Sequence, residues 1–267
     1  MTRTPATRSR PLRVFLSGAS SGLGAAFARH YAAPGVALGL VARRAEALAA
    51  LAEEFRASGA EVAVYALDVT DAAGLQAAAQ DFIGRFGIPD IVIANAGISV
   101  GTLGGDAADL AAVRRVLDVN VYGLAATLAP FVAPMRAAGQ GRLVGIASVA
   151  GIRGLPGAGA YSASKAAAIT YLESLRLEMH GSGVKVVTIC PGYIATPMTA
   201  INPYPMPFLL PAEEAIRRFA RVIERGSSYA VVPWPMGIVA KALRLLPNRL
   251  YDRLFAKAPG KPRGLPL

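Results

Sequence analysis

Residues 12–24 read Leu-Arg-Val-Phe-Leu-Ser-Gly-Ala-Ser-Ser-Gly-Leu-Gly. The first five residues form a short apolar run typical of a buried strand, and a helical pattern continues from the last glycine to Tyr31. A strand, a glycine-rich turn and a helix N-terminus can together hold a phosphate, because backbone N–H groups point at the anion and glycines let the backbone approach it. The spacing here is Gly-x-x-x-Gly-x-Gly, which gains weight because it follows a predicted strand directly.

Beyond this turn the chain alternates predicted strands with predicted helices. Further strands are expected at residues 36–42, 61–67, 90–94, 141–147, 184–189 and 229–232. This alternation indicates βαβ units, and therefore an α/β fold with a doubly wound, mostly parallel, seven-stranded Rossmann-like sheet. Ligands of such sheets bind at the carboxyl ends of the strands. Five residues at predicted strand ends are therefore expected to meet there: Ser17, Arg43, Asp68, Asn95 and Ser148.

The net charge of +11 is concentrated at the two ends of the 267-residue chain. Residues 14–240 hold 17 basic and 16 acidic residues, so the body of the protein is nearly neutral. A neutral body argues against a nucleic-acid-binding face. We therefore expect a disordered basic tail at 1–11, a Rossmann-fold catalytic domain at 12–235 and a basic amphipathic helical extension at 236–267.

Several features bear on the compartment and on metal binding. The N-terminus is polar and has no apolar segment of the signal-peptide kind, and no stretch reaches the roughly 18 apolar residues of a membrane span. Cys190, the single cysteine, cannot form an internal disulfide and is more typical of the core than of a nucleophile. His30 and His180 have no obvious partners. A cytoplasmic protein without a metal site is expected.

Tyr161 and Lys165 are four residues apart in a stretch, 161–180, that is predicted to be helical, so they share one face. A phenol has a pKa near ~10, and a neighbouring ammonium favours the phenolate and lowers that pKa. The pair suggests a general acid/base, although Tyr-x-x-x-Lys also occurs by chance on any helix. Small residues early in this helix favour close packing, which suggests a homodimer or homotetramer.

Arg43 and Arg44 follow the second predicted strand, where dinucleotide folds recognise the adenosine ribose. A carboxylate at this place binds the 2′-hydroxyl group, whereas an arginine accommodates a 2′-phosphate. Two arginines and no acid predict NADP(H) as the cofactor rather than NAD(H). The alternative is a pair of solvated arginines at the start of a helix.

Taken in order and spacing, these motifs resemble the short-chain dehydrogenase/reductase family over about residues 12–232. The matching pieces are Ser17-Gly18-x-x-x-Gly22-x-Gly24, Asp68-Val69, Asn95-Ala96-Gly97, Asn120, Ser148, Tyr161-x-x-x-Lys165 and Pro191-Gly192-x-x-x-Thr196. Two positions depart from the family pattern. Ser17 stands where the family usually has threonine, and Ala94 where asparagine is common; neither change removes a group that performs chemistry.

The resemblance implies roles for individual residues. Tyr161 would donate or accept the proton, Ser148 would hold the substrate oxygen, and Lys165 would lower the tyrosine pKa and bind the nicotinamide ribose. Asn120 would hold a water that passes protons to solvent. The residues implied to bind the cofactor are Ser17, Gly18, Ser20, Ser21, Gly22, Leu23, Gly24, Arg43, Arg44, Asp68, Val69, Asn95, Ala96, Gly97, Tyr161, Lys165, Pro191, Gly192, Ile194 and Thr196.

The prediction is an NADP(H)-dependent oxidoreductase that interconverts a carbonyl and a secondary alcohol. Residues 198–211 hold four prolines and several large apolar side chains, which favours a lid loop over a hydrophobic substrate. Two alternatives stay open: a non-catalytic nucleotide-binding regulator, or a protein acting at a membrane surface through its basic tail. The two helices expected on either side of Pro247 would pack on the body, on a partner subunit or on anionic lipid. Arg153 would meet an acidic substrate group or stay solvated.

Overall fold

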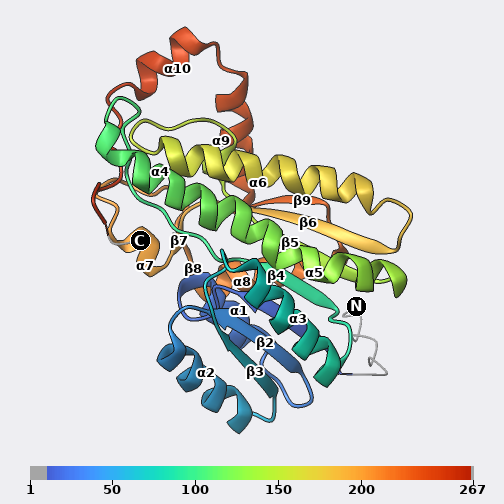
Figure 1. Cartoon of the computed structure of the whole chain (residues 1–267). Coiled ribbons are helices and arrows are strands. Elements are labelled where there is room, and N and C mark those ends of the chain that lie inside the picture. Colours follow the sequence, from blue (N-terminus) through green and yellow to red (C-terminus); the bar gives the residue numbers. More distant parts are fainter. Residues whose placement is uncertain (1–10, 266–267) are drawn as a thin grey trace.

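Seven parallel strands form the central sheet of the computed structural model, which describes residues 11–265 (Figure 1). Their order is β3-β2-β1-β4-β5-β6-β9, and every neighbouring pair is parallel. The strands are β1 (Arg13–Ser17), β2 (Ala37–Ala42), β3 (Glu61–Ala66), β4 (Ile91–Ala94), β5 (Gly141–Ile146), β6 (Val184–Pro191) and β9 (Tyr229–Val232). The predicted doubly wound sheet is confirmed, and the strand order reverses between β1 and β4.

Helices cover both faces of this sheet and create two hydrophobic cores. Along β1, Val14 and Leu16 point into one core and Phe15 into the other, because side chains of a strand alternate between its faces. The first core is closed by α1 (Gly22–Tyr31), α2 (Ala45–Ala57) and α8 (Ala212–Arg225). The second is closed by α3 (Ala72–Phe86), α5 (Gly123–Ala137) and α6 (Gly159–Glu178).

The helical region at 107–137 is not one regular α-helix. A short 3₁₀ turn, η1 (Ala107–Asp109), leads into α4 (Leu110–Leu117), and a π-turn, η2 (Asp118–Tyr122), joins α4 to α5. Within the described residues, this stretch alone has the length and mean hydropathy of a membrane span, 31 residues and 1.5. Its apolar inner face, including Phe131, is part of the second core.

The segment predicted as a lid loop contains more regular structure than its four prolines indicate. A turn of helix, α7 (Pro197–Ala200), begins it, and a two-residue strand, β8 (Leu210–Pro211), ends it beside β7 (Ile194–Ala195). The backbone N–H of Thr196 donates to the Thr199 hydroxyl over 3.0 Å, which stabilises the first turn of α7. Only the middle of the predicted lid is irregular.

The C-terminal extension forms two helices, α9 (Trp234–Leu245) and α10 (Asn248–Phe255), which project from one end of the molecule (Figure 1). The break at Pro247 matches the prediction. The basic tail predicted at 1–11 lies outside the described residues except for its last position.

Arg153 anchors the extension to the body, and both roles predicted for it are wrong. One terminal nitrogen of its guanidinium donates to the carbonyl oxygens of Leu243 and Leu246 over 2.8 and 2.9 Å. The guanidinium also lies 4.0 Å from the centre of the Tyr251 ring. The last carbonyls of a helix lack backbone partners and carry partial negative charge, so they are good acceptors for this cation.

Candidate active site

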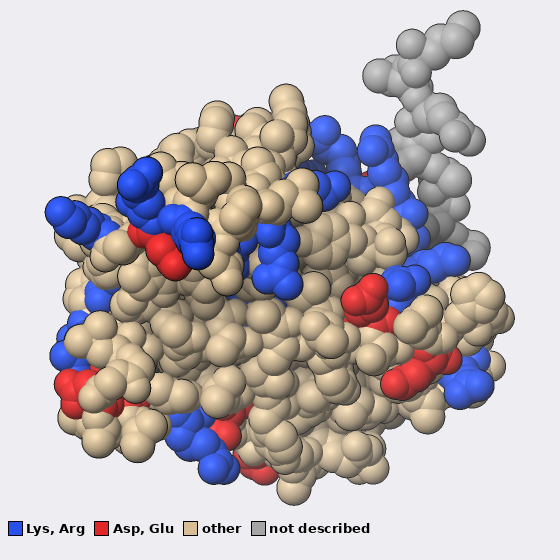
Figure 2. All heavy atoms as spheres, turned by 90° about the horizontal axis from the view of Figure 1, so that it is seen from above, with Lys and Arg blue, Asp and Glu red and all other residues tan. Residues whose placement is uncertain are grey.

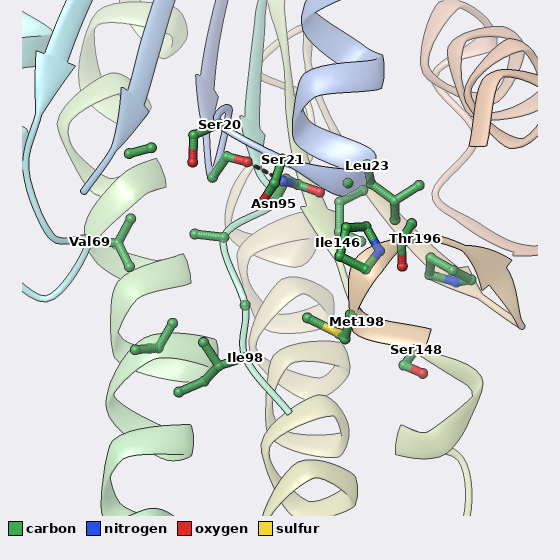
Figure 3. Close-up of a pocket in the computed structure, with 18 of the residues that line it drawn as sticks. Ser20, Ser21, Leu23, Val69, Asn95, Ile98, Ile146, Ser148, Thr196 and Met198 are labelled. Carbon is green, nitrogen blue, oxygen red and sulfur yellow. Dashed lines mark hydrogen bonds between the residues drawn. The ribbon is translucent and has the colours of Figure 1, made fainter. Parts of the chain in front are cut away.

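A cavity of about 730 Å³ opens at the carboxyl ends of the strands, where the strand order reverses. Figure 3 shows side chains from distant parts of the sequence around it, with Ser20 and Val69 on one side and Ser148 and Met198 on the other. Most of the predicted site residues line this cavity: Gly18, Ser20, Ser21, Gly22, Leu23, Arg43, Arg44, Asp68, Val69, Asn95, Ala96, Gly97, Ser148, Tyr161, Lys165, Pro191, Gly192, Ile194 and Thr196.

Two glycines of the turn after β1 are required by packing. Gly18 has φ of +71°, and a Cβ there would lie 2.7 Å from the Cα of Ala96. A Cβ on Gly24 would lie 1.8 Å from the carbonyl oxygen of Gly18. Gly24 does not reach the cavity. It allows α1 to begin close behind the turn, so that the N-terminus of α1 faces the cavity.

Ser17 also lies behind the cavity rather than in it. Its hydroxyl accepts from the backbone N–H groups of Asn95 and Ala96 over 3.3 and 3.4 Å. The side-chain amide of Asn95 donates in return to the carbonyl oxygens of Ser17 and Gly18, over 3.1 and 3.3 Å. These bonds tie the ends of β1 and β4 together and fix the glycine turn.

The end of the cavity next to β2 and β3 is cationic. Arg44 donates to the carbonyl oxygen of Ser20 over 3.0 Å, and an Arg43 nitrogen lies 3.9 Å from a carboxylate oxygen of Asp68. Asp68 also pairs with Arg115 from α4, a lining residue that the sequence analysis missed. Two guanidinium groups, those of Arg43 and Arg115, therefore contact one carboxylate, and a third, that of Arg44, contacts Ser20.

The ionisation of Asp68 follows from these contacts. Partial burial acts to raise the pKa of Asp68, but hydrogen bonds from Thr70 and Arg115 outweigh it and hold that pKa below its ordinary value. No sequence pattern distinguishes Arg115 from its neighbour Arg114, which instead pairs with Asp118 on the exposed side of the helix. Only the packing of α4 beside the end of β3 identifies Arg115.

Tyr161, Ser148 and Lys165 come together at the opposite end. The Ser148 side chain lies near enough to Tyr161 to act on the pKa of the phenol, and the Lys165 ammonium donates to the carbonyl oxygen of Ile146 over 2.8 Å. The Lys165 nitrogen lies 5.9 Å from the centre of the Tyr161 ring. The prediction from the four-residue spacing, that Tyr161 and Lys165 lie side by side, is therefore correct.

The prediction that the neighbouring lysine lowers the pKa of Tyr161 is wrong for the protein without a bound ligand. Desolvation raises the pKa of Tyr161, and the Ser148 side chain opposes this only in part. Burial lowers the pKa of Lys165 to about 8. Both shifts favour neutral groups because the interior solvates charge poorly. Four-residue spacing indicates that two groups are adjacent, but it does not reveal how deeply they are buried.

Asn120 occupies the π-turn and lies directly behind the cavity. Its side-chain oxygen accepts from the N–H of Ile98 over 2.8 Å, and its amide donates to Ile98 and to the Ser164 hydroxyl, each over 2.9 Å. The side chain is fully buried. It holds the segment after β4 against α6, and the binding of a water by Asn120 stays a prediction.

Other lining residues are apolar, and no sequence motif identified them as part of the site. Among them are Ile98, Val119 and Ile146. Cys190 is fully buried, as predicted, and burial raises the pKa of its thiol to about 11, so it is uncharged at neutral pH. Within residues 11–265 no cluster of three or more potential metal ligands is found.

Comparison with known proteins places this geometry in context. A family model described as short chain dehydrogenase matches residues 13–203. An uncharacterized oxidoreductase of Myxococcus xanthus is 40% identical over 237 residues, which cover 89% of this chain and 93% of that protein.

Two solved structures have the same fold. A short chain dehydrogenase/reductase from Burkholderia phymatum in complex with NAD has a TM-score of 0.79 and 26% identity, covering 96% of this chain and 99% of that one. An alcohol dehydrogenase from Thermococcus sibiricus, complexed with 5-hydroxy-NADP, has a TM-score of 0.74 and 26% identity, covering 84% of this chain and 96% of that one.

Proposed function

The chain belongs to the short-chain dehydrogenase family, and from that premise we propose that it is an NADP(H)-dependent oxidoreductase that interconverts a carbonyl and a secondary alcohol. The observation that carries the proposal is the make-up of one cavity. Its buried end holds a tyrosine and a serine beside a lysine, and its exposed end holds three arginines.

The residues present suit a dinucleotide with a 2′-phosphate. The turn at Gly18 and the N-terminus of α1 would hold the pyrophosphate, because no Cβ stands between the backbone and the anion. Arg43 and Arg44 follow β2, and no carboxylate is present at that position. The guanidinium groups would bind the 2′-phosphate. When bound, the nicotinamide supplies or accepts the hydride.

Tyr161 would perform the proton transfer. In the direction of reduction, its hydroxyl donates a proton to the carbonyl oxygen, while the Ser148 hydroxyl donates a hydrogen bond that holds the same oxygen in place. The raised pKa of Tyr161 keeps the phenol protonated at neutral pH, which suits reduction. Lys165, whose pKa is about 8, is mostly protonated at pH 7 and places positive charge beside the developing phenolate.

The substrate would be apolar. Met198 lines the cavity, and the segment that continues from it exposes Ile201, Phe208 and Leu209. Apolar side chains beside a few convergent polar groups favour a hydrophobic carbonyl compound over a small charged one.

Two measurements test the proposal. NADPH should raise the melting temperature more than NADH at equal concentration, and NADPH should be consumed when a panel of apolar ketones is added. A stronger effect of NADH would refute the assignment of the arginines but not the reaction type. Tight NADPH binding without turnover of any ketone or alcohol would instead indicate a nucleotide-binding regulator.

A further inference from the structure

The two C-terminal helices carry apolar side chains on their solvent-facing side. On α9, Trp234, Ile238 and Leu245 are 69%, 60% and 83% exposed, and their spacing of four and seven residues places them on one face. On α10, Leu250 and Leu254 are 49% and 65% exposed and lie one turn apart. We call these five side chains the C-terminal patch.

The inner faces of both helices are already used to hold the extension on the body. Met236 and Ala240 of α9 are buried, and α9 contacts β9 and the loop that follows Ser148. Tyr251 of α10 is buried, and its hydroxyl donates to the carbonyl oxygen of Gly154 over 2.6 Å. On α9 the patch thus lies opposite the buried side chains, and on α10 it lies to one side of Tyr251. Contacts among the described residues do not explain its apolar character.

Exposed cations accompany the patch. Lys241 shares the face of Ile238 and Leu245, and Arg249, Arg253 and Lys257 belong to or follow α10. Between residues 234 and 257 the only acidic residue is Asp252. Figure 2 looks down on the end of the molecule that carries these helices, and separate blue side chains stand there on a largely uncharged surface.

We propose that the C-terminal patch docks on the surface of an anionic lipid bilayer. Apolar side chains would enter the boundary between headgroups and acyl chains, while the cations would contact lipid phosphates. Tryptophan is favoured at this depth because its ring is amphipathic. A second copy of the chain fits less well, because a symmetric contact would bring the same four cations face to face.

The patch is connected to a wall of the cavity. After α10 the chain turns back, and the Lys261 ammonium donates to the carbonyl oxygen of Met198 over 3.1 Å. The carbonyl of Pro262 accepts from the N–H of Gly101 over 2.9 Å. A bilayer at the patch would therefore lie near the segment that contacts the predicted lid. The proposal itself does not depend on the reaction proposed above.

The chain carries its own reporter for the test, because Trp234 is its single tryptophan. Full-length protein would be mixed with vesicles of equal parts phosphatidylcholine and phosphatidylglycerol, and with vesicles of phosphatidylcholine alone. Flotation and Trp234 emission would be recorded. We expect co-flotation and a shift of emission to shorter wavelength with the anionic vesicles only, and release at high salt.

Variants separate the apolar from the ionic contribution. The double variant L245E/L254E should abolish vesicle binding. The double variant R249Q/R253Q should weaken it about 30-fold, since each cation near an anionic surface contributes roughly fivefold. Leu177→Glu is the matched control, because Leu177 is also largely exposed but lies on α6, and it should bind as the unaltered chain does. Unchanged melting temperatures would establish that all variants are folded.

Three outcomes would overturn the proposal. The first is no flotation with anionic vesicles, and the second is equal binding to both kinds of vesicle. In the third, the unaltered chain does not bind vesicles, and light scattering shows that L245E/L254E forms a smaller particle than the unaltered chain does. This result would assign the patch to contact between copies. Because turnover is not measured, each outcome leaves the proposed reaction standing.

Discussion

The two ends of the cavity are built on different principles. At the buried end, Lys165 and Ser148 are buried, and their neighbours are the desolvated phenol of Tyr161 and backbone carbonyls. At the exposed end, Arg43 is half-exposed and shares Asp68 with Arg115. Desolvation lowers the pKa of Lys165 at the first end. At the second end, hydrogen bonds and the ion pair with Arg115 lower the pKa of Asp68.

This difference indicates how each end responds to substitution. A buried group that acts alone cannot be replaced by a neighbour or by water, so its loss should have a large effect. Exposed charges are screened and partly redundant, so the loss of one should have a modest effect. Four variants test this contrast.

Tyr161→Phe should produce the largest effect. It removes the only hydroxyl proposed to transfer the proton, and we expect kcat to fall by about 10²–10⁴-fold. NADPH binding should change little, which the melting temperature with and without NADPH would show. A variant that retains more than a tenth of the activity would exclude Tyr161 as the general acid.

Lys165→Met should lower kcat by about 10²-fold and at the same time stabilise the protein at neutral pH. The folded-state pKa of Lys165 is about 8 against an ordinary 10.5, so below pH 8 both states are protonated and the folded state bears the full cost of a buried ammonium. That cost disappears as pH rises towards 10.5. We expect a gain of about 1–3 kcal/mol at pH 7, after the lost bond to Ile146, and almost none near pH 10.

The measurement for Lys165 is urea unfolding of both proteins at the two pH values. The sign is the informative result. The quantity compared is the stability gain of Lys165→Met over the unaltered chain. If this gain were smaller at pH 7 than at pH 10, desolvation would not be the cause of the lowered lysine pKa.

The double variant R43Q/R44Q should reverse the cofactor preference without affecting the chemical step. We expect the Kd for NADPH to rise about 10–100-fold, because charge-assisted bonds to the 2′-phosphate are lost, and the Kd for NADH to change less than threefold. Titration of intrinsic fluorescence with each cofactor measures both constants. Equal losses for the two cofactors would place these arginines away from the 2′-position.

Arg115→Gln should have the smallest effect, about 3–10-fold in the Kd for NADPH. Without Arg115, the carboxylate of Asp68 would attract Arg43 more strongly and oppose the 2′-phosphate. Arg114→Gln is the matched control, since Arg114 pairs with Asp118 outside the cavity, and its effect should be within error. Identical behaviour of the two variants would show that the pair with Asp68 plays no part in cofactor binding.

The fold and the position of the site were predictable because they depend on local patterns. Alternating strands and helices predict the sheet, and the turn at Gly18 predicts where the cavity opens. The partners of Arg115 and Arg153 were not predictable, because they lie 47 and about 90 residues away in the sequence. The role of the Asn120 side chain was missed for the same reason: its partner Ile98 is reached through a π-turn that has no sequence signature.

Arg153 has a consequence for the order in which the protein matures. It belongs to the loop between Ser148 and Tyr161, yet its carbonyl partners are at residues 243–246 and its aromatic partner is Tyr251. During synthesis on the ribosome the glycine turn and strands β1 to β6 emerge well before these partners do. The glycine turn can therefore assemble on a nascent chain, whereas the loop between Ser148 and Tyr161 gains its anchor only after residues 243–251 have emerged.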